Sequence, residues 1–98
     1  MYKIYSVCVD GDGQCAVFIV DELYEKTKLM FSGDNMHQPY YQEYADGLYD
    51  ALKMLDKKVS YSHIWLSSKE DLEENKELLQ SAKVYYEFEN DFREYGLL

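Results

Sequence analysis

The segment 10–13, Asp-Gly-Asp-Gly, lies between two apolar runs and constrains the fold more than any other part of the sequence. Asp-Gly pairs favour tight turns, because glycine tolerates the backbone angles that a short hairpin loop requires. The run 2–9 is rich in aromatic and β-branched residues, and the run 15–20 is apolar on both faces. These patterns predict a β-hairpin, closed by a two-residue loop at 11–12 or a four-residue loop at 10–13.

Two cysteines, Cys8 and Cys15, sit symmetrically about this turn. Either loop length places them directly opposite each other across the hairpin. We expect two reduced, packed thiols, with a cross-strand disulfide or redox pair as the alternative. Two cysteines are too few for a disulfide-stapled scaffold, and they lack the spacing and company of zinc ligands.

Beyond the hairpin, residues 23–32 suit a third antiparallel strand, and turn-forming residues at 32–35 end it. The hydrophobic period then changes to that of a helix over about 38–57, with Pro39 in its first turn. The apolar face of this helix is predicted to contain Tyr41, Tyr44, Ala45, Leu48, Leu52 and Leu55.

A fourth strand is predicted at 60–66, followed by two overlapping capping boxes that start at Ser67 and Ser68. A second helix is expected from there to about Gln80. Apolar and polar residues alternate over 84–89, which predicts a charged edge strand. We therefore expect one α/β domain over 1–98, with a short acidic-aromatic tail at 90–98. Its five-stranded mixed sheet would have the order β-β-β-α-β-α-β, with right-handed crossovers to parallel later strands.

The charge balance removes several classes of function. Nineteen Asp and Glu against ten Lys and Arg leave a formal charge of −9, which repels polyanions and argues against direct nucleic-acid binding. No run approaches the roughly 20 apolar residues of a membrane span. Residues 1–5 lead into strand-like sequence without an apolar signal core, so we expect a cytoplasmic protein.

Three short stretches occur in characteristic places: Asp10-Gly11 ends the first strand, Ala51-Leu52 lies in the first helix, and the apolar run 64–66 precedes serines. Together with the element order, they resemble the ribonuclease H-like fold in a truncated form, over roughly residues 2 to 88. The resemblance implies a nuclease that holds two divalent cations with three or four carboxylates.

The carboxylates of that family are only partly present. Asp10 matches the first metal-binding position, but Tyr44 stands where the family has a catalytic Glu, and Ser67 stands where it has an Asp. The neighbouring acids are Glu43 and Asp71. A divergent Mg²⁺- or Mn²⁺-dependent nuclease using Asp10, Glu43 and Asp71 is therefore the alternative interpretation. The main interpretation assigns no catalytic residue, metal or cofactor.

Acidic and tyrosine residues favour a different role. Glu43, Asp46 and Asp50 fall opposite the apolar face of the first helix, which is the usual position of a solvated stripe. Eleven tyrosines exceed the needs of a core of this size, and tyrosine is an efficient interface residue. The predicted binding surface consists of Tyr40, Glu43, Asp46, Tyr49, Asp50, Tyr85, Glu87, Glu89 and Tyr95.

These observations predict a small, non-catalytic, acidic interaction or inhibitory module. Its acids would imitate the phosphate rows of a duplex and occupy the basic nucleic-acid-binding surface of a partner protein, as proteins of phages and mobile elements do. A third interpretation is a homodimeric structural protein that pairs its edge strand or its tyrosine face.

Overall fold

The computed structural model describes residues 1–10, 13–23, 25–34 and 40–98. Its described part forms a mixed sheet of four strands in the order β3-β2-β1-β4, not the five that we expected. β1 pairs antiparallel with β2 and parallel with β4, and β2 pairs antiparallel with β3. The elements are β1 (Tyr2–Val9), β2 (Gln14–Asp21), β3 (Lys26–Asp34), α1 (Tyr41–Met54), β4 (Val59–Leu66), α2 (Lys69–Ser81), α3 (Val84–Glu87) and α4 (Glu89–Glu94).

The predicted hairpin is confirmed. β1 ends at Val9 and β2 begins at Gln14, so residues 10–13 connect the strands. Residues 11 and 12 lie outside the described part. The Gly13 N–H donates to the Val9 carbonyl at 2.8 Å, and Cys8 and Cys15 are Cα partners in the ladder. Cys8 and Cys15 do not form a disulfide, and both are fully buried.

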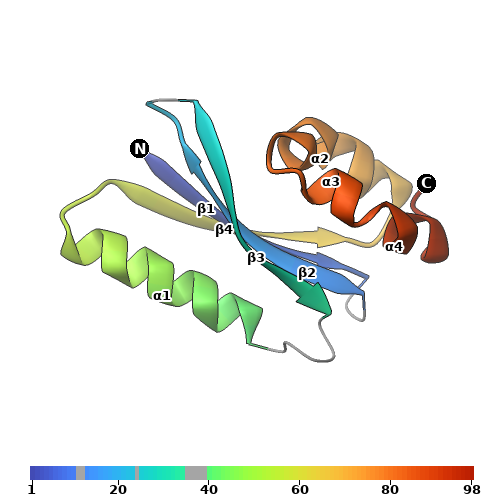
Figure 1. Ribbon diagram of the computed structural model, residues 1–98, viewed down its shortest axis with the longest axis horizontal. Helices are drawn as coiled ribbons and strands as arrows, with labels where there is room; N and C mark the ends of the chain where they lie inside the picture. Colours follow the sequence, from blue (N-terminus) through green and yellow to red (C-terminus); the bar gives the residue numbers. More distant parts are fainter. Residues whose placement is uncertain (11–12, 24, 35–39) are drawn as a thin grey trace.

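Helices cover both faces of the sheet, α1 on one side and α2, α3 and α4 together on the other (Figure 1). Because side chains alternate along a strand, β1 contributes to two cores. Ile4 and Cys8 pack under α1, and Val7 and Val9 pack under the other helices. Within the described residues, no helix has both the length and the apolar character needed to cross a membrane.

Several boundaries differ from those expected. β3 continues through Ser32 and Gly33, which we had placed in a turn, and α1 starts at Tyr41 with Pro39 outside the described part. Of the two capping boxes, the structure uses the one at Ser68, whose Oγ accepts from the Asp71 N–H at 3.1 Å.

The predicted fifth strand is wrong. Residues 84–94 form the short helices α3 and α4, because Val84, Phe88 and Phe92 recur every four residues and are all fully buried on one side. A strand would have buried Tyr86 and exposed Tyr85. Instead, Tyr86 is 63% exposed and Tyr85 is 8% exposed. The segment 90–98 is not a tail either, since Phe92 and Leu97 pack into the core.

Candidate functional site

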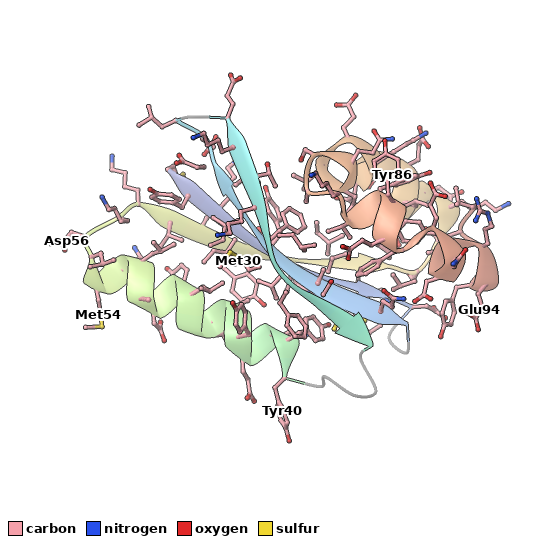
Figure 2. The ribbon with its side chains drawn as sticks, in the orientation of Figure 1. Met30, Tyr40, Met54, Asp56, Tyr86 and Glu94 are labelled. Atoms are coloured by element: carbon pink, nitrogen blue, oxygen red, sulfur yellow. The ribbon has the colours of Figure 1, made fainter. Side chains whose placement is uncertain are left out.

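The exposed side of α1 carries most of the binding residues that the sequence predicted. Tyr40, directly before the first turn, is 69% exposed and points away from the sheet (Figure 2). Glu43, Asp46 and Asp50 are exposed on the helix that follows. We call this surface the α1 face, and it comprises Tyr40, Glu43, Tyr44, Asp46, Tyr49 and Asp50.

The helical period explains this arrangement, with two corrections. Tyr41 and Ala45 are buried against the sheet, as expected, and burial raises the pKa of the Tyr41 phenol, so it remains neutral. Tyr44, which we had placed on the buried face, is 42% exposed. Its ring contacts that of Phe31 on β3, with centroids 5.8 Å apart. Leu55, expected on the same buried face, lies beyond the end of α1 and is exposed.

A hollow of about 390 Å³ lies where the start of α1 meets β3. Aromatic rings form most of its lining, and Glu43 supplies its only carboxylate among the described residues. The lining consists of Phe31, Tyr40, Tyr41, Glu43 and Tyr44.

A second hollow, of about 430 Å³, lies on the other side of α1, against β4. It also contains tyrosine rings and one carboxylate, here that of Asp46. Its lining consists of Asp46, Tyr49, Val59, Ser60 and Tyr61. The Lys53 ammonium already lies 5.7 Å from the centroid of the Tyr49 ring, which shows that a cation has access to this tyrosine.

The carboxylates of the α1 face form no ion pair with another described residue. Lys3 pairs with Glu22 and Arg93 pairs with Glu89, whereas no ion pair within the described residues involves Glu43, Asp46 or Asp50. These three carboxylates are exposed and form no direct ion pair, although Lys53 lies one turn beyond Asp50 on α1.

The remaining predicted binding residues lie on the opposite side of the sheet. Tyr85 is a core residue, in contact with Phe92 at 5.5 Å between ring centroids, so it was wrongly expected at an exposed face. Glu87 is exposed, while Glu89 and Tyr95 are half-buried around α4. They do not belong to the α1 face.

A polar cluster between β1 and β4 was missed at the level of sequence. The buried Ser6 hydroxyl lies 2.7 Å from His63 Nδ1 and 2.8 Å from Tyr61 Oη. With one proton to donate and lone pairs to accept, it bonds to both. The sequence pattern that could have indicated this cluster is the placement of Tyr61, His63 and Trp65 at every second position, on one face of β4. Because Ser6 is fully buried, it has no access to a substrate, and this cluster is a packing feature.

Protonation of His63 is expected to destabilise the fold. Desolvation lowers the pKa of His63 below its ordinary value, and hydrogen bonding with Ser6 offsets this only in part. The unfolded chain therefore binds a proton first, and stability should fall as the pH drops through about 6.5 toward the folded-state pKa. Urea midpoints between pH 8 and 5.5 measure this. The urea midpoint of the variant His63→Asn, whose amide can still bond to Ser6, should depend less on pH. Parallel curves for the two proteins would contradict the assignment of the pH dependence to His63. Both proteins contain His37, so its contribution to the pH dependence cancels in the comparison.

The carboxylates required for the nuclease alternative are not brought together. Asp10 directly follows β1, Glu43 lies on α1, and Asp71 lies on α2, on the opposite side of the sheet from α1. Hydrogen bonds from the Ser67 N–H and hydroxyl, both 3.0 Å, occupy Asp71 Oδ2 and lower the pKa of Asp71. Among the described residues, no three His, Cys, Asp or Glu side chains are grouped so that they could hold a metal ion.

No family model, no curated protein and no solved structure matches the chain. The resemblance in element order therefore stays a prediction, and the candidate site rests on its geometry.

Proposed function

We propose that this chain is a non-catalytic interaction module whose α1 face binds a basic protein partner. The observation that carries this proposal is the pair of hollows flanking α1, each with tyrosine walls and one carboxylate. Each hollow would receive one Lys or Arg side chain of the partner.

The chemistry of the hollows suits a cation with an apolar stem. A Lys or Arg side chain packs its methylenes against tyrosine rings, and its charge interacts with the ring face, at about 0.5–2 kcal/mol. A charge-assisted hydrogen bond to Glu43 or Asp46 then fixes the head group. Single exposed ion pairs contribute little, so affinity would come from two filled hollows and the charge of Asp50 beside them.

The finer role that we propose is inhibition of a nucleic-acid-binding protein in the cytoplasm, of the kind that phages and mobile elements encode. At 1.5 Å rise per residue, Glu43, Asp46 and Asp50 are spaced by about 4.5 and 6 Å along the helix axis, which suits the imitation of a polyanion. Kinship with the ribonuclease H-like fold is likewise a proposal, supported by the order of elements through α2 and weakened by the absence of a fifth strand among the described residues.

Removing the three charges of the α1 face should weaken binding of a basic probe. The triple variant Glu43→Gln, Asp46→Asn, Asp50→Asn keeps side-chain size and should bind an arginine-rich peptide at least about tenfold more weakly near 0.15 M salt. Raising salt to about 0.5 M should weaken the wild-type complex strongly, because exposed charges are screened. Isothermal titration calorimetry measures both effects.

A matched control lies on α2. Its exposed side has a hollow of about 570 Å³ lined by Glu73, Glu74, Lys76, Glu77 and Gln80, without an aromatic ring. The triple change of Glu73, Glu74 and Glu77 to Gln removes the same charge, and should alter the affinity no more than about twofold. Equal losses in the two triple variants, or binding that salt leaves unchanged, would show that net charge or apolar contact alone is responsible.

A further inference from the structure

The two edges of the sheet differ in how they are protected against pairing. β3 carries Lys26 and Lys28, and a bulge interrupts its register with β2 between Val17 and Phe18. Such charges and bulges discourage another strand from adding to an edge. β4 contains no charged residue and no proline, and it pairs with β1 in an unbroken register over its eight residues.

The outer side of β4 is also uncovered. In the described part of the sheet, β4 is a terminal strand, hydrogen-bonded to β1 alone. Ser62 and His63 are exposed. The large apolar ring of Trp65, the single tryptophan of the chain, is also 51% exposed. A long, uncharged edge with an exposed aromatic residue is a site for pairing with a further strand.

We propose that two copies of this chain associate through antiparallel pairing of β4 with β4, which makes one continuous sheet across a two-fold axis. Self-pairing suits this strand, because β4 contains no Asp, Glu, Lys or Arg that could repel its copy in any register.

Charges at the two ends of β4 specify the antiparallel arrangement. Lys57 and Lys58 directly precede the strand and are exposed. At its other end, the exposed Asp10 lies beside Leu66, whose carbonyl accepts from the Asp10 N–H at 2.9 Å, and Glu70 is exposed on the first turn of α2. Antiparallel pairing places the lysines of each copy near the acids of the other, twice by symmetry.

Trp65 reports on this interface. Among the registers that keep the two copies of α1 on one side of the sheet, the two with the greatest overlap are centred on Ser62 and on His63. They place Trp65 opposite Val59 or Tyr61 of the second copy, respectively. Dimer formation should therefore bury the indole ring in either register.

Sedimentation equilibrium of the full chain near 0.15 M salt tests the proposal. The average mass should rise with concentration from 11.6 kDa toward twice that value. The emission of Trp65 should shift to shorter wavelength over the same range. Ser62→Lys places a charge on the β4 edge and should weaken association at least about tenfold. Ser32→Lys makes the same change at the exposed Ser32 of β3 and should leave it unchanged.

A wild-type chain that remains at 11.6 kDa up to about 1 mM would overturn the proposal, since that excludes even a weak dimer. Equal weakening by the two lysine variants, or a mass increase without a change in Trp65 emission, would place the interface elsewhere. Circular dichroism of each variant checks that the exposed substitution preserves the fold. The proposal does not depend on the partner of the α1 face, and its failure would leave the binding test above intact.

Discussion

Replacing Phe92 with alanine is expected to lower the free energy of unfolding by about 3–5 kcal/mol. Phe92 is fully buried, and its ring contacts Phe88 and Tyr85 with centroids 6.4 and 5.5 Å away. Its carbonyl also accepts from the Leu97 N–H at 2.7 Å, which holds the C-terminal residues against the core. Since small domains are stable by only about 5–15 kcal/mol, this loss removes a large part of the total. Urea denaturation followed by circular dichroism measures it.

Tyr86→Ala is the matched control for this prediction. Tyr86 lies on α3, and its ring meets Tyr85 edge-on, but 63% of it is exposed. The helical arrangement therefore predicts a loss of at most about 1 kcal/mol. A strand over 84–89 would instead bury Tyr86. Comparable losses for Tyr86→Ala and Phe92→Ala would contradict the helices.

The first 83 residues were more predictable than the last fifteen, and the reason is local. The Asp-Gly turn limits the register of the first hairpin, so the pairing of Cys8 with Cys15 follows from sequence. The Ser68 cap and the change of period at α1 are also local signals. Over 84–92, however, the same apolar residues fit a strand and a helix, and packing of Phe92 against Val9 and Phe18 in one core decides for the helix.

The candidate site was predictable only in part. Helical periodicity placed Glu43, Asp46 and Asp50 on one exposed stripe, and this is where they lie. It could not show that Tyr44 would leave the core, because its exposure depends on how α1 sits against Phe31 of β3. The grouping of Tyr49 with Tyr61 also depends on a contact between α1 and β4 that is distant in sequence.

The two proposed surfaces are neighbours, with a consequence for binding. Tyr61 lines one hollow of the α1 face and lies on β4. A two-fold axis perpendicular to the sheet keeps both copies of α1 on the same side. The pairing places Trp65 of one copy at the hollow beside β4 of the other, so a dimer would present to one partner the two hollows between α1 and β3. A partner with two basic segments would then gain affinity from linkage of the two binding events, beyond that of either alone.

Gly13→Ala is expected to destabilise the protein by about 3 kcal/mol, because the hairpin and α4 meet at this glycine. A Cβ atom at this position would lie 2.7 Å from the Val9 carbonyl oxygen, 2.9 Å from Val9 Cβ and 3.0 Å from Asp91 Oδ2. The same carboxylate accepts from the Gln14 N–H at 2.7 Å. Relief of the clash therefore requires the turn or α4 to move, and movement lengthens this bond or the one from Gly13 to Val9.

Gly47→Ala makes the same chemical change where the structure leaves room. Gly47 lies in the interior of α1, and apart from its chain neighbours and the backbone of its own helix no atom lies within 4 Å of its Cβ position. Alanine favours helix over glycine, so this variant should gain about 0.5–1 kcal/mol. The two variants should thus shift the urea midpoint in opposite directions. If Gly13→Ala were neutral, α4 could not lie against the hairpin through Asp91, and the docking of the C-terminal helices on this side of the sheet would have to be revised.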